Sequence, residues 1–307
     1  MKHEVRITII LLSMFIATQL IGLMVIDAYS PKIVSQVVNG TVTNVTVSRE
    51  IPYGMQPPEI KPEISIISIM ISLAIAVGVF FLLIKIKARL LIKAWFAFVI
   101  YITSAVALYA LFLKLFPDLN ANILALVIAL PLTFYKAIKP NLIVHNITEL
   151  LIYPGLAAVF VPILNTWSIL LLLLIISIYD MWAVWKSKIM IKMAKYQMNH
   201  LKVFTGFFVP YLPKGVKLVK SSSRNATKGK KVKIAIALLG GGDVAFPLIF
   251  AGVIYRSAGL IPALIIIGGS TLALALLFMF SQKGKFYPAM PFISAGCLAG
   301  WLVTLIV

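Results

Sequence analysis

Two aspartates, Asp180 and Asp243, are the only acidic residues after Glu149, and each lies within a long run of apolar residues. A carboxylate is costly in membrane hydrocarbon, so an acid at such a position is by default a functional-site candidate. Two neighbouring carboxyls in a low dielectric cannot both ionise cheaply, and they therefore share one proton. The ionised carboxyl can act as a general base on water while the protonated one polarises a carbonyl. This is the chemistry of peptide hydrolysis by paired aspartates, and it needs neither a metal nor a covalent nucleophile.

Composition assigns the chain to the polytopic membrane proteins. Of its 307 residues, 61% are hydrophobic and 12% are charged, with a mean hydropathy of +1.03. Soluble domains carry roughly 25% charged residues. The single cysteine, Cys297, excludes an internal disulfide and multi-cysteine metal sites, and the histidines at 3, 145 and 200 are too scattered to suggest a metal site. We therefore expect no metal and no cofactor.

Apolar runs bounded by charges or by Pro and Gly clusters predict an all-α protein with nine transmembrane helices. The predicted spans are 5–26, 64–84, 92–113, 119–137, 147–163, 166–185, 232–255, 258–280 and 288–307. We expect residues 1–163 to form an N-terminal bundle of spans one to five, with an external loop at 27–63. Residues 164–307 would form the catalytic half, with a basic cytoplasmic loop at 186–231.

The distribution of basic residues predicts the orientation. The net charge is +19, and most of the 28 lysine and arginine residues fall in segments on the same side as the N-terminus. Because such residues accumulate on the cytoplasmic side, we expect the N-terminus inside and the C-terminus outside. The alternative reading of the positive charge is nucleic-acid binding, but the basic loop contains no recognisable nucleic-acid module. We expect no nucleic-acid partner.

Several loop segments and polar residues also carry predictions. Residues 42–47 alternate like a strand, 51–62 are typical of a Pro-rich linker, and 203–212 are predicted to lie along the membrane interface. His145 and Glu149, near the start of the fifth span, are expected to reach that interface. Asp27 and Asp118 stand at span ends, where an acid needs no special explanation.

Depth in the membrane favours a pairing of the two aspartates. Asp180 precedes Lys186 by six residues, and Asp243 follows Lys233 by ten. At about 1.5 Å per residue, the carboxyls lie roughly 9 and 15 Å from their flanking lysines. On antiparallel neighbouring helices they would occupy similar depths, in the cytoplasmic half of the membrane.

The run Gly240-Gly241-Gly242 directly before Asp243 adds a second signal. Each glycine in a helix costs up to ~1 kcal/mol relative to alanine, so three in succession need a reason. Close packing with a partner helix is one reason, and a backbone open to a substrate is another. With the aspartate at its end, the run favours a site.

At these residues the chain resembles the presenilin and signal peptide peptidase family of GxGD intramembrane aspartyl proteases. The family pattern has Tyr-Asp in the sixth span, Gly-x-Gly-Asp in the seventh and Pro-Ala-Leu at the start of the ninth. The corresponding residues are Tyr179-Asp180, Gly240-Gly241-Gly242-Asp243 and Pro288-Ala289-Met290. Met290 departs from the family leucine, a change that nearly conserves volume and should be tolerated.

The resemblance implies an intramembrane aspartic endopeptidase with Asp180 and Asp243 as its catalytic pair. Tyr179, the three glycines and Pro288-Ala289-Met290 would shape the active site and position the substrate. Substrates would be transmembrane helices or signal-peptide remnants in the lipid bilayer, cut in the cytoplasmic half of the membrane. The orientation matches presenilins, whereas residues 242–247 look more like the peptidase branch, so the branch stays open.

A compact homologue of this kind points to the cell membrane of a prokaryote. Self-association is possible, and nothing indicates obligate partner subunits. Cleavage needs an extended substrate, and residues 216–219 and 232–236 are the candidate strands that could pair with one. Both segments can be interpreted equally well as an ordinary loop or as the start of a helix.

Other functions remain as alternatives. A proton- or cation-coupled transporter could also use paired intramembrane acids, although we see no symmetric pair of broken helices. A prepilin peptidase is disfavoured by the position of the GxGD motif, and a non-catalytic scaffold has no need of two costly acids. Gly296 and Gly300 form a GxxxG pattern in the last span, which we interpret as helix packing within the chain.

Overall fold

The computed structural model describes residues 5–38, 41–47, 49–56, 62–116, 120–138, 141–186, 205–211, 235–281 and 287–306. This part of the chain is mostly helical and contains two short antiparallel strand pairs. The helices are α1 (Val5–Tyr29), α2 (Pro62–Lys85), α3 (Arg89–Leu115), α4 (Ala121–Ala137), α5 (Leu142–Phe160), α6 (Thr166–Met181), α8 (Gly241–Ala258), α9 (Leu260–Phe280) and α10 (Met290–Thr304). The strands are β1 (Lys32–Val38), β2 (Thr41–Val47), β3 (Gly206–Tyr211) and β4 (Ala235–Gly240). A 3-10 turn, η1 (Val161–Ile163), follows α5, and a π-helical turn, η2 (Trp182–Lys186), follows α6.

Each predicted span coincides with one of the α-helices among the described residues, although the bounds differ. Five helical segments there are long and apolar enough to cross a membrane, namely Val5–Tyr29, Arg89–Leu115, Leu142–Ile163, Thr166–Lys186 and Leu260–Phe280. Helices suit this environment because they satisfy every backbone polar group internally where no water is present. The membrane character of the chain follows, whereas the exact number of nine crossings and the side of each terminus stay predictions.

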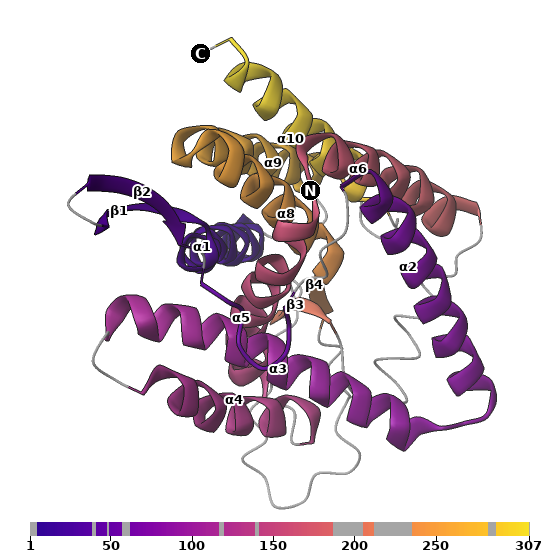
Figure 1. The fold of residues 1–307 in the computed structure, drawn as a ribbon. Helices are drawn as coiled ribbons and strands as arrows, with labels where there is room; N and C mark the ends of the chain where they lie inside the picture. The colour runs from indigo at the N-terminus through magenta and orange to yellow at the C-terminus, as the bar shows by residue number, and fades with distance from the viewer. Residues whose placement is uncertain are drawn as a thin grey trace, which may run out of the picture.

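Helices α1, α5 and α8 pack against one another at the centre of the molecule (Figure 1). Helices α9 and α10 pack closely together beside α8, and α3 pairs with α4 on the other side of the centre. Helix α6 packs against both α8 and α10, whereas α2 makes only small contacts with α3 and α6 at the periphery. This arrangement brings the sixth and seventh predicted spans into direct contact.

The prediction of a continuous seventh helix over 232–255 is wrong at its start. Residues Ala235–Gly240 form strand β4, and α8 begins only at Gly241. The glycine run is costly within a helix, so the helix starts at the run instead of passing through it. Strand β4 pairs antiparallel with β3, with Gly206 opposite Gly240.

The prediction that 203–212 lies along the membrane interface is also corrected. Strand β3 occupies most of that segment. Phe207 of β3 and Leu239 of β4, which lie opposite each other, are both buried. The pairing with β4 satisfies backbone groups that an isolated apolar loop would leave unpaired.

The strand predicted at 42–47 is confirmed as β2, and β1 pairs with it in an antiparallel hairpin. The predicted linker 51–62 is described only in part, and the candidate strand 216–219 lies outside the described residues. The division of the chain at residue 163 stays a prediction.

The GxxxG pattern packs α10 against α9, as the sequence predicts. A Cβ at Gly296 would overlap the Gly269 carbonyl oxygen, and a Cβ at Gly300 would lie 2.9 Å from the Ile266 Cα. The two helices therefore approach each other closely at three glycines, as small-residue patterns allow.

Substitution of Gly269 by alanine should destabilise the protein by about 1–3 kcal/mol, because the added Cβ would overlap the Gly296 carbonyl oxygen. The neighbouring Gly268 is the matched control, since a Cβ there would meet no atom within 4 Å. Gly268→Ala should be neutral or stabilising by up to ~1 kcal/mol. Thermal unfolding of both variants in detergent makes the comparison, and equal melting temperatures would contradict the packing described.

Candidate active site

Asp180 lies in the last turn of α6 and Asp243 in the first turn of α8. Because these helices pack against each other, the two carboxyls are close enough to repel one another when both are charged. The two acids are separated by a long basic segment in the sequence. The fold therefore brings together the pair that the sequence predicts.

The Asp180 carboxyl is held at the start of α10. Its side chain is only 5% exposed, and its Oδ2 atom accepts a hydrogen bond of 3.1 Å from the backbone N–H of Met290. The amide of Ala289 also lies near this carboxyl. One turn earlier, the hydroxyls of Ser177 and Ser294 are hydrogen-bonded over 2.9 Å, which adds a second link between α6 and α10.

Asp243 is half-buried, and its carboxyl lies close to Gly240 at the end of β4. It is within reach of the Gly240 amide, and a Cβ at Gly240 would stand 3.0 Å from Asp243 Oδ2. The first turn of α8 is also held by the fully buried Gln19 of α1, whose Nε2 donates to the Val244 carbonyl over 3.0 Å. The backbone on both sides of Asp243 is therefore fixed.

The three glycines have different surroundings. Any side chain at Gly240 would crowd the Asp243 carboxyl, and a Cβ at Gly241 would stand 2.9 Å from the hydroxyl oxygen of Tyr153. At Gly242 the nearest atom would be in Phe246 at 3.5 Å, which is ordinary van der Waals contact. Close approach therefore accounts for Gly240 and Gly241, whereas Gly242 is not sterically required.

The remaining predicted site residues divide into two groups. Pro288 and Met290 are buried and Ala289 is partly buried, all beside Asp180 at the start of α10. Tyr179 is 50% exposed, and its ring packs against Trp182 with a centroid distance of 6.1 Å. The fold thus brings the Pro-Ala-Met segment to Asp180, and it leaves Tyr179 on an exposed face of α6.

A buried polar cluster next to the site is missing from the sequence prediction. Glu149 is fully buried and His145 is 6% exposed, so the expectation that both reach the membrane interface is wrong. Glu149 forms an ion pair with Lys136 of α4, which is also buried, and Asn146 completes the cluster. The spacing of His145 and Glu149 places them on one helix face and could have suggested a shared role.

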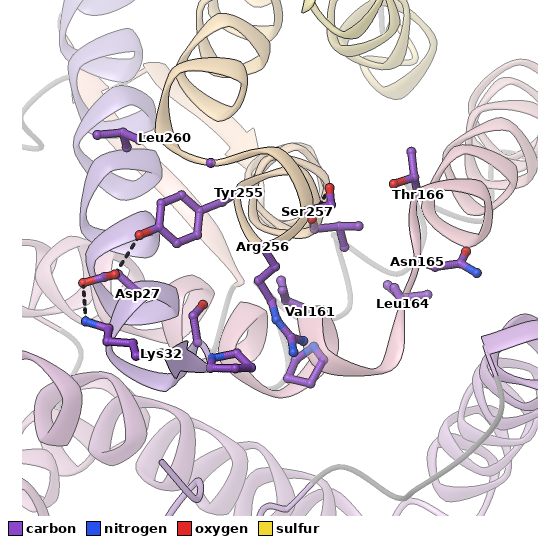
Figure 2. A pocket seen from close by; sticks show the side chains of 15 residues that line it. Asp27, Lys32, Val161, Leu164, Asn165, Thr166, Tyr255, Arg256, Ser257 and Leu260 are labelled. Atoms are coloured by element: carbon purple, nitrogen blue, oxygen red, sulfur yellow. Dashed lines mark hydrogen bonds and ion pairs between the residues drawn. The ribbon is translucent and has the colours of Figure 1, made fainter. Parts of the chain in front are cut away.

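The polar cavity in Figure 2 lies at the other end of α8, away from the aspartates. It has a volume of about 640 Å³, and its lining includes Tyr255, Arg256 and Asp27. The Tyr255 hydroxyl donates to Asp27 Oδ1 over 2.7 Å, and Lys32 Nζ lies 3.5 Å from Asp27 Oδ2 (Figure 2). Lys114 Nζ, which the figure does not draw, lies 3.2 Å from the same Oδ2 atom. Asp27 therefore joins α1 and α3 to the C-terminal end of α8.

Among the residues that the structure describes, no group of three or more histidine, cysteine, aspartate or glutamate side chains is placed to hold a metal ion. The pair of carboxyls with its adjacent backbone amides is suited to general acid–base chemistry.

A family model described as "Signal-peptide peptidase, presenilin aspartyl protease" matches residues 33–307. The chain belongs to this family. It is accordingly an intramembrane aspartyl protease and an integral membrane protein. The resemblance that the motifs suggest is thereby confirmed, and the transporter alternative has no support.

Solved structures of a presenilin family intramembrane aspartate protease share the fold of the chain. One, in space group C222, has a TM-score of 0.63 at 22% identity and covers 98% of this chain and 99% of its own. Another, in space group P2, has a TM-score of 0.59 at 22% identity and covers 96% of each chain. No curated protein matches the chain.

Proposed function

We propose that this presenilin-family chain cleaves peptide bonds within the membrane through Asp180 and Asp243. The observation that carries the proposal is the placement of both carboxyls within electrostatic reach on two packed helices. Each carboxyl also lies beside a backbone amide, Met290 for Asp180 and Gly240 for Asp243. Neighbouring amides stabilise one ionised carboxyl while the pair holds a single proton.

The pair acts as general base and general acid in turn. The ionised carboxyl removes a proton from water as the water oxygen bonds to the peptide carbonyl carbon, and the protonated carboxyl donates to the carbonyl oxygen. The resulting gem-diol collapses as a proton passes to the amide nitrogen and the C–N bond breaks. The products are a carboxylic acid and an amine. Between turnovers the pair again holds one proton, so no metal or covalent intermediate is required.

The outer edge of β4 is the proposed docking edge for an extended substrate. The backbone groups of Gly206 and Phe208 in β3 bond to side chains of α5, so these groups point away from β4. In antiparallel pairs, directly opposed residues alternate between bonded and non-bonded positions. Gly240 and Leu238, which oppose them, therefore direct their own backbone groups to the outer edge, where the Gly240 N–H faces the Asp243 carboxyl. A substrate strand added there would lie next to Asp243.

The other predicted site residues receive supporting roles. Pro288, Ala289 and Met290 form the surface of the active site beside Asp180. The glycines at 240 and 241 keep side chains away from the peptide bond to be cut. Tyr179, exposed on α6, is placed to contact the entering substrate.

We propose transmembrane helices or signal-peptide remnants as substrates, in the cell membrane of a prokaryote. The surplus of basic residues on the N-terminal side supports a cytoplasmic N-terminus and cleavage in the cytoplasmic half of the bilayer. Self-association and assignment to the presenilin or the peptidase branch stay predictions.

Cleavage of a reporter transmembrane peptide in liposomes tests the proposal. The purified chain should release two fragments that mass spectrometry assigns to one internal bond or a few adjacent bonds. Proton or cation flux is measured on the same liposomes. Flux that depends on the chain, without any cleavage, would favour the transporter instead.

The pH profile of cleavage should be bell-shaped, because the active form of the pair holds one proton. As pH falls, both carboxyls become protonated and the general base is lost. As pH rises, both ionise and the general acid is lost. Initial rates across a broad pH range, with substrate at low concentration, measure the profile. A rate that stays constant across that range would argue against a shared proton.

A further inference from the structure

Three buried polar side chains of α5, His145, Asn146 and Glu149, bond to the backbone of strand β3. We propose that Glu149, held in place by Lys136, is a positioning residue for the protease reaction, because its carboxylate fixes strand β3 and thereby the backbone that carries Asp243. The inference rests on the proposed function and adds to it a group that does not touch substrate.

The Glu149 carboxylate has two partners on different elements. Its Oε1 atom forms an ion pair with Lys136 of α4 and accepts a 3.1 Å hydrogen bond from the backbone N–H of Gly206 in β3. The side chains of Lys136 and Glu149 are both fully buried. The carboxylate therefore serves as a fixed acceptor for the first amide of the strand.

Two neighbouring side chains of α5 hold the same edge of β3. His145 Nε2 lies 2.8 Å from the carbonyl oxygen of Gly206. The Asn146 side chain donates to the Phe208 carbonyl over 3.1 Å and accepts from the Phe208 N–H over 3.3 Å. Side chains of α5 thus take the place of a third strand, and they fix the position of β3 along the helix.

The fixed strand transmits its position to the catalytic backbone. Gly206 lies opposite Gly240 in the β3–β4 pair, and Asp243 follows three residues after Gly240. A shift of β3 along α5 would therefore move the end of β4 and the first turn of α8. At an active site, a misplacement of about 1 Å can cost ~10²-fold in rate.

Tyr153 provides a second connection from the cluster to the glycine run. Its ring packs edge-on against Phe207 with a centroid distance of 5.8 Å, and its hydroxyl would stand 2.9 Å from a Cβ at Gly241. The other Glu149 oxygen, Oε2, is buried near this hydroxyl. The cluster therefore reaches the catalytic turn both through the strands and through a side chain.

Stability alone does not explain why a buried ion pair occupies this position, because a well-packed apolar pair of similar volume often stabilises a protein at least as well. What an apolar pair cannot supply is an acceptor for the Gly206 N–H. Two double variants separate these contributions, since neither leaves an unpaired buried charge. Lys136→Met with Glu149→Gln keeps an acceptor oxygen at position 149, whereas Lys136→Met with Glu149→Leu removes it.

We expect the glutamine double variant to cleave the reporter peptide within about threefold of the wild type. The leucine double variant should lose ~10²-fold in kcat. Hydrogen exchange followed by mass spectrometry should show the Gly206 amide protected in the wild type and in the glutamine variant, and exchanging faster in the leucine variant. Equal activity of the two variants, whether both high or both low, would overturn the proposal, as would unchanged protection of the Gly206 amide.

The two readouts separate this inference from the proposed function. Inactive wild-type protein would count against the proposed protease chemistry, and hydrogen exchange at Gly206 would still decide whether Glu149 positions β3. Active wild-type protein with no difference between the double variants would leave the protease chemistry intact and remove the positioning role.

Discussion

Replacement of Asp180 or Asp243 by asparagine should reduce peptide cleavage by at least ~10³-fold in either variant. Asparagine has nearly the same size, and its carbonyl oxygen can still accept the Met290 N–H at position 180. It can neither remove a proton from water nor hold the proton that the pair shares. The loss should therefore appear in kcat, with both variants folded and monodisperse in the same detergent as the wild type.

Asp27→Asn is the matched control for these two variants. Asp27 is also an acid in an apolar helix, but it lies at the opposite end of α8, where it bonds Tyr255. Loss of its partly exposed pairs with Lys32 and Lys114 should cost no more than about 1 kcal/mol. Cleavage should continue near the wild-type rate. Full activity in either active-site variant would remove the general acid–base mechanism.

Replacement of Lys136 alone by methionine should cause the largest loss of stability, about 3–5 kcal/mol. Methionine fills a similar volume, but it leaves the Glu149 carboxylate fully buried without its cation. The polar neighbours that remain around Glu149 Oε1 are the Gly206 N–H at 3.1 Å and His145 Nε2 at 3.6 Å. Thermal unfolding in detergent should show a decrease on the order of 10 °C in the apparent melting temperature.

Addition of Glu149→Gln to the Lys136→Met variant should restore most of the lost stability, because no buried charge then remains. A double variant that is more stable than the single variant is specific to a buried pair, since removal of both partners reduces the free energy of unfolding less than removal of one. A double variant that is less stable than the single one would mean that Lys136 and Glu149 stabilise the fold separately.

The sequence contains enough information to predict the family and most of the helices, and to single out two aspartates that the fold places on packed helices. Long apolar runs have few alternatives to helices in a membrane, so their approximate bounds can be inferred without knowledge of tertiary contacts. Asp180 and Asp243 stand out because nearly every other residue around them is apolar. The glycine packing of α9 against α10 is likewise visible as a small-residue pattern.

The strand pair and the buried cluster could not be predicted in the same way, because they depend on contacts between distant segments. Strand β4 has an apolar sequence that suits a helix equally well, and its pairing with β3, beside the glycine run that follows it, decides the outcome. Glu149 looks like an interfacial residue when considered alone, and Lys136 stands at the end of a predicted span. Their burial follows from the packing of α4 and β3 against α5, which no local pattern records.

The attachments of α8 and α6 give the two carboxyls different mechanical freedom. Helix α8 is bound to α1 near both of its ends, through Gln19 at Val244 and through Asp27 at Tyr255. The polar links of Asp180 and Ser177 run instead to α10, at Met290 and Ser294. Asp243 thus belongs to the part of the site that is tied to α1, and Asp180 to the part that is tied to α10. Because α10 in turn packs closely against α9 at three glycines, a displacement of α6 that keeps these links and widens the gap between the carboxyls would have to carry α10 and α9 with it.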